Sequence, residues 1–402
     1  VLREAYAMGA DQGYLISDRA FGGADVLATS YTLMQAIRSA GDYDLILCGR
    51  QTTDGDTAQT GSALAAWMGW QQLNWVTELK AEGEQITAVC RMDEQTAEVT
   101  ASLPCVVMVE RDGFLPRMPS LKLKMQGRKK AVRVISLAEL PDSDPEHYGL
   151  RGSATRVKKI FAPQSAEKKE LVYKSGAEGA TYILKALREP ESCKAERKNS
   201  SGPEILSDYG DRKDSNGAER NKIPGWSGIL VYLQCREGHM HSSGPELIGQ
   251  ARRLAAQSGD PVWVLGIGSH MERLWEELAG YPVSHAFLYE TDDVFEPCRY
   301  ASLAAACIRE QKPSVVLVGG TLEGRALAPR LSVEFRTGLT ADCTELSMGA
   351  DGNLVQTRPA FGGNVMASIL TENSRPQFAT VRPGVMEPVE KREGFSVPCS
   401  LQ

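Results

Sequence analysis

Glycines, threonines and two aspartates gather in one short stretch of the sequence, "DLILCGRQTTDGDTAQTG" at residues 44–61. An apolar run precedes them, and a helical pattern begins near Thr57. Where a buried parallel strand leads into a helix, free backbone N–H groups and the helix dipole face an anion. Thr57, Gln59 and Thr60 can add side-chain donors for phosphate oxygens. The stretch therefore predicts a phosphate-binding loop, and the alternative is a capped turn that holds no ligand.

The glycines and the acids of this loop have different expected roles. Gly49, Gly55 and Gly61 allow the backbone to come close to a ligand, because glycine carries no side chain. We expect replacement of Gly55 to weaken ligand binding, because a side chain there would either clash with the ligand or oppose a backbone conformation that only glycine adopts easily. Asp54 and Asp56 do not suit direct contact with phosphate. They are expected to cap the helix, or to accept hydrogen bonds from sugar hydroxyls or backbone groups.

The chain repeats the plan that leads into this loop. Residues 27–49 and 299–320 both read as an amphipathic helix, a polar turn and a buried strand that ends in glycine. Gly49 and Gly319 lie 270 positions apart, and four further pairs of segments follow in the same order at offsets of 267 to 272. Matches in one order at nearly one offset predict two copies of a single domain.

The second copy differs from the first at the loop itself. Residues 319–332 carry Arg325 and Pro329 where the first copy has small polar residues, so this loop is expected to hold no ligand. Asp342 follows in "LTADCTEL". A buried carboxylate in such a place is expected to accept hydrogen bonds from backbone N–H groups.

Short apolar strands alternate with helical patterns along both copies, which predicts an α/β fold. We expect two homologous, doubly wound parallel-sheet domains of the Rossmann-like, adenine-nucleotide-binding type, joined by a disordered linker. The predicted boundaries are 1–188 for the first copy with a C-terminal arm, 189–225 for the linker, 226–388 for the second copy and 389–402 for the start of a further domain. Residues 228–280 have no counterpart in the first copy, so the full-length protein is expected to extend upstream by one βαβ segment.

Composition excludes several classes of function. A formal net charge of -6 and a pI of 5.6 argue against a nucleic-acid surface. The basic run at residues 121–130 is expected to be a solvated loop, with a docking patch for an acidic partner as the alternative. No apolar run reaches about 18 residues, so we expect no membrane insertion and a cytoplasmic location. The nine cysteines are scattered singly without a CxxC pair, which argues against a metal site.

Several longer blocks resemble the electron transfer flavoproteins. "AMGADQGYLISDRAFGGADVLATSYTLMQAI", followed by the loop at 44–61, is similar to the β subunit of that family. "LVGGTLEGRALAPRL", "QTRPAFGGNVMASI" and "RPQFATVRPGVM" are similar to the first domain of the α subunit. Residues 149–163 and a helix near 180–187 resemble the C-terminal arm of the β subunit. The resemblance implies a β–α fusion in one polypeptide, whose β-like and α-like parts pair within the chain.

The resemblance also implies electron carriage. Members of the family accept electrons from flavin dehydrogenases, such as the acyl-CoA dehydrogenases of fatty acid β-oxidation. They pass them on through FAD held mainly by the second domain of the α subunit, which would follow Met386. The β-like loop would hold AMP or a second FAD, and in forms from anaerobes the second FAD takes a hydride from NADH and splits the electron pair between two acceptors. The predicted cofactor-binding residues are Gly49, Arg50, Gln51, Thr52, Asp54, Gly55, Asp56, Thr57, Gln59, Thr60, Arg358, Phe361 and Asn364.

Arg358 lies in the turn "TRPAFGGN" of the second copy. A guanidinium beside a flavin could stabilise negative charge on the reduced ring. The alternative is a structural turn in which Arg358 caps backbone carbonyls. For the whole chain, the alternative to an electron carrier is a nucleotide-binding regulatory module or an assembly module with no redox role.

Overall fold

A computed structural model of the protein describes residues 1–52, 55–93, 95–163, 175–188, 223–292, 294–392 and 396–402. The chain divides into two units, Val1–Pro163 with Glu219–Gln402, and Gln164–Ala218, which contains helix α5 (Gly176–Arg188). The predicted linker at 189–225 lies outside the described residues except for its last three, and Asp54 lies outside them too. None of the described helices combines the length and apolar character needed to cross a membrane.

The second copy contains a parallel sheet of seven strands in the order β15-β19-β14-β9-β12-β13-β20. Each neighbouring pair is parallel. The strands are β9 (Ile229–Leu233), β12 (Val262–Gly268), β13 (His285–Glu290), β14 (Val315–Gly319), β15 (Leu339–Cys343), β19 (Gln377–Val381) and β20 (Cys399–Leu401). Residues 389–402, predicted to begin a further domain, therefore contribute β20 to this sheet, a strand too short to give a clear pattern in the sequence.

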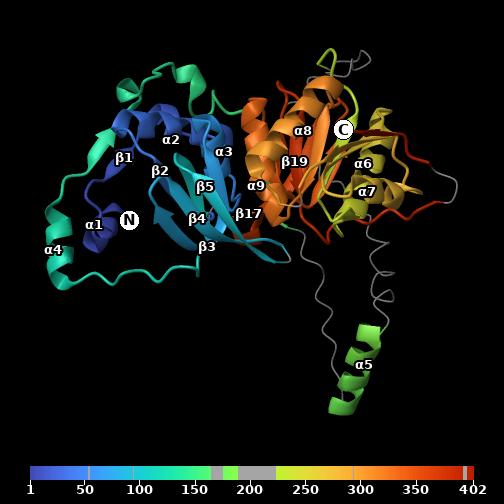
Figure 1. Ribbon diagram of the computed structural model, residues 1–402, viewed down its shortest axis with the longest axis horizontal. Helices are drawn as coiled ribbons and strands as arrows, with labels where there is room; N and C mark the ends of the chain where they lie inside the picture. Colours follow the sequence, from blue (N-terminus) through green and yellow to red (C-terminus); the bar gives the residue numbers. More distant parts are fainter. Residues whose placement is uncertain (53–54, 94, 164–174, 189–222, 293, 393–395) are drawn as a thin grey trace. The chain divides into compact units, whose positions relative to one another are not determined.

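Helices cover both faces of this sheet, as Figure 1 shows. Alternate residues of β9 point to opposite faces. Ile229, Val231 and Leu233 join one core with α6 (Gly244–Ser258) and α7 (Met271–Leu278). Leu230 and Tyr232 join the other core with α8 (Pro297–Gln311) and α9 (Leu322–Glu334). The predicted doubly wound α/β architecture is thus confirmed.

The first copy is built on a sheet in the order β2-β6-β3-β4-β5. β2 (Leu45–Gly49), β6 (Cys105–Val109) and β3 (Gln71–Glu82) are parallel, and β4 (Gln85–Arg91) and β5 (Thr96–Ser102) extend the sheet antiparallel. Helices α2 (Val26–Ala40) and α3 (Thr60–Met68) pack against each other, and α1 (Leu2–Met8) contacts α4 (Leu121–Lys129). β1 (Tyr14–Ile16) pairs separately with β7 (Arg133–Ile135).

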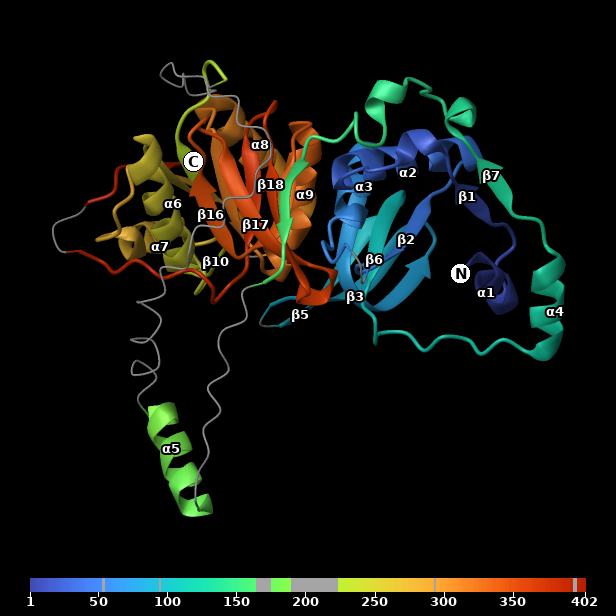
Figure 2. The same ribbon diagram turned by 180° about the vertical axis from the view of Figure 1, so that it is seen from behind.

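An antiparallel sheet in the order β16-β17-β18-β8 combines strands of both copies. The second copy contributes β16 (Glu345–Met348), β17 (Leu354–Ala360) and β18 (Val365–Leu370). A small hairpin of β10 (Cys235–Arg236) and β11 (His239–Met240) lies outside this sheet. β8 (Arg156–Phe161) comes from the arm of the first copy and runs beside β18, as Figure 2 shows. The arm therefore completes a sheet of the other copy.

The two copies share one irregularity of the backbone. In β3 the pairing with β6 shifts between Leu73 and Val76, and in β15 the pairing with β19 shifts between Thr340 and Cys343. One residue inside each bulge adopts a left-handed backbone conformation. This residue is Trp75 in the first copy, with a φ of 59°, and Asp342 in the second copy, with a φ of 54°. Bulges of this kind bend a strand at a defined position. The same bulge at an offset of 267 residues confirms the internal repeat.

Two elements differ from the prediction. Helix α3 begins at Thr60 and not near Thr57, because Asp56 and Ala58 adopt left-handed φ values of 50° and 53° that a helix cannot include. The basic run forms helix α4 and not a loop. The Ser120 side chain caps it by accepting from the Leu123 N–H at 3.3 Å, and leucine, lysine, methionine and arginine favour the helix.

Candidate functional site

The predicted loop lies at the carboxyl end of β2, where ten residues separate this strand from α3. Gly61, in the first turn of α3, fixes how the helix meets the sheet. A Cβ atom there would lie 2.6 Å from Cγ and Sδ of Met108, so only glycine allows α3 to pack this closely on β6. The start of the helix is therefore held against the strand ends by close packing.

Gln59 lies immediately before α3 and is only 2% exposed. Its side chain does not cap the helix, and among the described residues neither its Nε2 nor its Oε1 atom has a hydrogen-bond partner. A buried amide without partners costs free energy, and native proteins rarely keep one without a reason. A bound ligand with polar atoms would supply those partners. The buried amide of Gln59 therefore leaves polar atoms available to a ligand at the loop.

Arg358 reaches this loop from β17 of the second copy. Its Nη2 atom donates to the backbone carbonyl oxygens of Gly55 at 3.1 Å and Asp56 at 3.2 Å. The residue is 7% exposed, and burial lowers the pKa of its guanidinium, an effect that the Asp342 and Asp56 carboxylates oppose. Arg358 therefore caps carbonyls, as the structural alternative expected, but they belong to the candidate loop of the other copy.

The first residue of the loop is tied to the sheet. Nη1 of Arg50 donates to both carboxylate oxygens of Glu110, at 2.9 and 3.1 Å, and its guanidinium lies 5.2 Å from the centroid of the Trp75 ring. Glu110 follows directly after β6, so this ion pair links the ends of two neighbouring strands. The Arg50 charge is thus already compensated within the protein.

The acids and amides of the loop hold its own conformation. Asp56 was expected to cap the helix, or to accept hydrogen bonds from sugar hydroxyls or backbone groups, but its Oδ1 atom accepts from Nε2 of Gln51 at 2.6 Å. The Asp56 N–H donates to the carbonyl oxygen of Thr52 at 3.2 Å, which closes a turn. Thr57 and Thr60 are half-buried beside Gln59, where their hydroxyl groups can serve as donors.

The two loop glycines are less constrained than the sequence suggested. A Cβ atom at Gly49 would meet no atom within 4 Å, and one at Gly55 would lie 3.3 Å from Oγ1 of Thr52. Gly55 is not in the left-handed region, which Asp56 and Ala58 occupy instead. The backbone conformation at Gly55 therefore does not require glycine, and the expected cost of a side chain there to ligand binding stays a prediction.

Phe361 and Asn364 belong to the turn between β17 and β18. Nδ2 of Asn364 donates to the carbonyl oxygen of Phe361 at 2.9 Å, and the Phe361 ring is 59% exposed. Of the residues predicted in the second copy, the described contacts bring Arg358 to the first-copy loop, while Asn364 stabilises its own turn.

The corresponding loop of the second copy is closed by protein groups. Thr321 caps α9 by accepting from the Gly324 N–H at 3.1 Å, and Oδ1 of Asp93, from the first copy, accepts from the Leu322 N–H at 2.9 Å. Nη2 of Arg325 donates to both carboxylate oxygens of Asp342 at 2.7 and 2.6 Å. Asp342 was expected to accept from backbone N–H groups, so its ion pair corrects that expectation. Sequence reasoning missed Asp93, because its partner Leu322 lies 229 positions away in the sequence.

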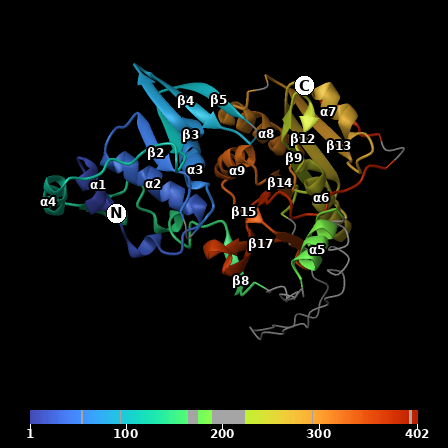
Figure 3. The same ribbon diagram turned by 90° about the horizontal axis from the view of Figure 1, so that it is seen from below.

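The two copies therefore exchange contacts at their loops. They also meet along α3 and α9, which Figure 3 shows side by side. Nε2 of Gln72 donates to the carbonyl oxygen of Ala326 at 3.1 Å, and Nη1 of Arg330 donates to that of Trp70 at 3.2 Å. The predicted pairing of the two parts within the chain is visible in these contacts.

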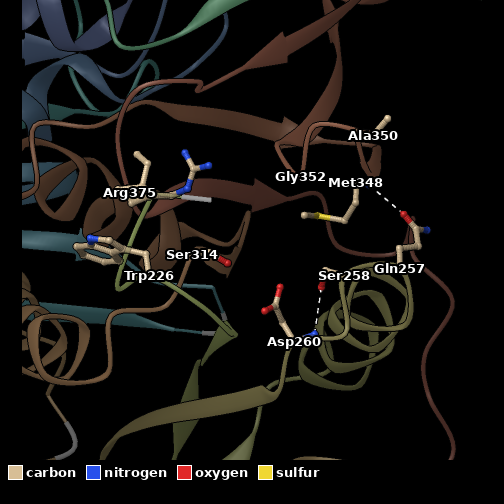
Figure 4. A pocket seen from close by; sticks show the side chains of 11 residues that line it. Trp226, Gln257, Ser258, Asp260, Ser314, Met348, Ala350, Gly352 and Arg375 are labelled. Carbon is tan, nitrogen blue, oxygen red and sulfur yellow. Dashed lines mark hydrogen bonds between the residues drawn. The ribbon is translucent and has the colours of Figure 1, made fainter. Parts of the chain in front are cut away.

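A separate cavity of about 300 Å³ lies at the amino ends of strands in the seven-stranded sheet. Figure 4 shows its lining, including Asp260 before β12, Ser314 before β14 and Arg375 before β19. Arg375 is tied to its surroundings, because Nη2 donates to Oδ1 of Asn353 at 2.9 Å. None of the predicted cofactor-binding residues lines this cavity.

The loop after β2 fits the phosphate of a nucleotide. It offers the start of a helix without a side-chain cap, the unpaired amide of Gln59 and the hydroxyl groups of Thr57 and Thr60. The described part of the chain, which leaves out Asp54, contains no group of three or more histidine, cysteine or acidic side chains that could hold a metal ion.

Comparison with known proteins agrees with this geometry. Residues 1–140 and 229–400 match the electron transfer flavoprotein domain family. The chain is 48% identical over 170 residues to the lactate dehydrogenase (NAD(+),ferredoxin) subunit LctC of Acetobacterium woodii, covering 41% of this chain and 40% of that protein. It is also similar to both electron transfer flavoprotein subunits of Megasphaera elsdenii. The β subunit is 40% identical over 169 residues, covering 40% of this chain and 62% of the subunit.

The α subunit of the same organism is 40% identical over 168 residues, covering 41% of this chain and 50% of the subunit. The chain thus spans about half the length of these relatives, and its similarity to both subunits is consistent with a β–α fusion. Because the family match covers most of the sequence and includes both copies, the chain belongs to the electron transfer flavoprotein family.

Proposed function

We propose that this protein is an electron carrier that combines the β and α parts of an electron transfer flavoprotein in one chain. Residues 1–188 would be the β-like part and residues 226–388 the α-like part. The observation that carries the proposal is the open loop before α3, with its unpaired Gln59 amide, in a chain of this family. A bound flavin supplies the redox chemistry, because it can accept one or two electrons.

The loop after β2 holds AMP or a second FAD in this proposal. The hydroxyl groups of Thr57 and Thr60 and the amide of Gln59 bind phosphate oxygens at the start of α3. Arg358 keeps the carbonyls of Gly55 and Asp56 turned toward its guanidinium, so that they do not face the anion. The resemblance assigns the main FAD to the second domain of an α subunit.

Two classes of electron donor are candidates. The resemblance to the family favours a flavin dehydrogenase of the acyl-CoA dehydrogenase type. The name of the relative LctC joins a lactate dehydrogenase with NAD(+) and ferredoxin, which supports an electron-bifurcating form that takes a hydride from NADH. In such a form the second FAD occupies the β-like loop.

The segment around α4 supports docking of a partner dehydrogenase. Its apolar side chains are unusually exposed, with Leu115 at 99%, Met118 at 87% and Leu121 at 76%. Basic residues lie among them, at positions 122, 124 and 128–130. Exposed apolar residues with charged neighbours are typical of interaction surfaces, and the basic residues would meet an acidic partner.

The test uses the full-length protein and asks which nucleotide it binds and what reduces it. Calorimetry with AMP and with FAD is combined with anaerobic absorbance of bound flavin during addition of NADH, or of an acyl-CoA dehydrogenase with its substrate. A flavin reduced by either donor supports electron carriage, and the donor that works identifies the form. Nucleotide binding without any flavin reduction would instead indicate a regulatory or assembly module.

A further inference from the structure

A cavity of about 410 Å³ lies away from the candidate loop, between elements of both copies. Tyr31 of α2 and Trp67 near the end of α3 form part of its wall, and Arg336 and Asn373 of the second copy form another part. Its volume is within the range of small-molecule sites in proteins. We call it the Arg336 cavity.

The aromatic wall of the Arg336 cavity is held in place. The ring centroids of Tyr31 and Trp67 lie 5.0 Å apart with an edge-to-face angle of 64°. The Tyr31 hydroxyl donates to Oδ2 of Asp142 at 2.6 Å, and Nε1 of Trp67 donates to Oγ of Ser30 at 3.2 Å. Because the polar ends of both rings already have partners, their apolar surfaces are available to pack against a ring of a ligand.

Arg336 is exposed and brings a positive charge that has no ion-pair partner among the described residues. Another arginine of the lining, Arg151, has a partner, since its Nη1 atom lies 2.7 Å from Oε1 of Glu146. The Arg336 side chain forms no ion pair or hydrogen bond with the described residues. The carbonyl oxygens at the end of α9 do not need the Arg336 side chain as a donor. Backbone N–H groups already donate to the carbonyl oxygens of Leu331, Ser332 and Val333.

The backbone at Arg336 ends helix α9. Its φ of 47° lies in the left-handed region. This conformation closes the helix, because the N–H groups of Arg336 and Thr337 donate to the carbonyl oxygens of Val333 and Ser332. Burial and Asp142 raise the pKa of the Tyr31 phenol, and Arg336 opposes that rise, so its charge acts on the aromatic wall. An unpaired cation and two fixed rings thus meet in one cavity.

We propose that the Arg336 cavity binds a small aromatic carboxylate, separate from the nucleotide loop. The planar guanidinium of Arg336 matches a carboxylate through two parallel hydrogen bonds. The ring of the ligand packs against Tyr31 and Trp67, and the side-chain amide of Asn373 lies in the same lining. The acids nearby already have hydrogen-bond partners, since Arg151 binds Glu146, and both the Tyr31 hydroxyl and His147 bind Asp142.

The test is calorimetry of the full-length protein with benzoate and with nicotinate, each in the presence of saturating AMP so that the loop is occupied. The wild-type protein is expected to bind one equivalent of at least one probe, and Arg336→Met is expected to weaken binding at least tenfold. Arg336→Lys should keep part of the affinity, because it retains the charge. Cyclohexanecarboxylate should bind more weakly than benzoate, since it lacks the aromatic ring.

Arg299→Met is the matched control, because this exposed arginine pairs with Asp292 at 3.3 Å outside the cavity. Circular dichroism checks that each variant is folded. If neither probe binds saturably to the wild-type protein, the proposal is overturned. It is equally overturned if Arg336→Met and Arg336→Lys both bind as the wild-type protein does.

Discussion

The loop after β2 and the loop after β14 occupy the same place in the two copies, but their helices begin differently. Two residues separate β14 from α9, and the start of that helix is closed by Thr321 and by Asp93. Ten residues separate β2 from α3, and the residue before that helix, Gln59, provides no cap. The second copy thus obtains an anion from the protein itself, and we propose that in the first copy a ligand takes that position.

The two side chains through which the copies contact each other's loops carry opposite charges. The first copy sends the Asp93 carboxylate to the helix start of the second, and the second sends the Arg358 guanidinium to the loop of the first. A helix start favours a negative charge, and Asp93 satisfies it. A guanidinium cannot satisfy α3 in this way, so it holds the loop carbonyls instead. One fold can therefore make one loop a structural joint and the other a binding site.

The largest effect is expected from Arg325→Met. Asp342 is 4% exposed, and without Arg325 its nearest cation is Arg382 at 3.8 Å. A buried charge that loses its partner costs about 3–5 kcal/mol of unfolding free energy. Urea denaturation measures this loss. Arg50→Met should cost less, about 1–3 kcal/mol, because the Arg50 side chain is 34% exposed. Equal losses of unfolding free energy in Arg325→Met and Arg50→Met would show that ion pairing stabilises the second loop no more than the first.

Glycine substitutions in the two loops should also differ in their effect on stability. A Cβ atom at Gly324 would lie 1.9 Å from the carbonyl oxygen of Gly319, which the helix start cannot accommodate. Gly324→Ala should cost about 3 kcal/mol in urea denaturation. Gly55→Ala should change the unfolding free energy by less than about 0.5 kcal/mol, since its loop is exposed. The comparison fails if Gly55→Ala is the more damaging of the two.

The third prediction concerns pH and the start of α9. Burial raises the pKa of Glu323 to about 8, and the Tyr232 hydroxyl, which donates at 2.6 Å, opposes the rise. The folded state keeps this proton between pH 4.5 and 8, where the unfolded chain has lost it. Stability is therefore highest below that window and falls as pH rises through it, by at most about 1.4 kcal/mol per pH unit.

Glu323→Gln should flatten this part of the stability profile, and Tyr232→Phe should move its upper limit to higher pH. Urea denaturation at several pH values measures both variants. A slope that persists unchanged in Glu323→Gln would assign the proton to another group.

Arg358→Met tests the cation at the first loop. Loss of its hydrogen bonds to Gly55 and Asp56 should weaken AMP binding by about 10- to 100-fold, which corresponds to about 1.4–2.8 kcal/mol. Calorimetry with the full-length protein measures the affinity. Asp93→Asn is the reciprocal change and should lower stability while leaving AMP affinity within twofold. Similar AMP losses in both variants would mean that the loops respond to pairing of the copies as a whole.

The smallest effect is expected from Gln59→Leu. An apolar side chain of similar size removes the unpaired amide, so the ligand-free protein should gain about 1 kcal/mol of unfolding free energy. The same change removes a ligand contact, so the stabilisation that AMP gives in denaturation experiments should fall. Thr60→Val is a matched change with no expected gain in the ligand-free protein. A loss of stability in ligand-free Gln59→Leu would mean that the amide has a structural role.

The local sequence pattern predicted those features of the two loops that depend on residues close together in the sequence. The strand, the glycine at its end, the helix and their repetition follow from apolar periodicity and could be read from the sequence. The helix start could not, because Asp56 and Ala58 adopt left-handed conformations and alanine ordinarily favours a helix. The role of Arg358 could not either, since its partners lie 302 and 303 positions away. Such contacts depend on how α3 packs against α9.

The pairing of β8 with β18 has a consequence for how the two copies stay together. If separate chains supplied these strands, the paired fraction would fall as the protein is diluted. Because one chain supplies both, the effective concentration of each strand is set by the residues between them and not by the sample. The two parts are also made in a one-to-one ratio, without any need to balance the synthesis of two gene products.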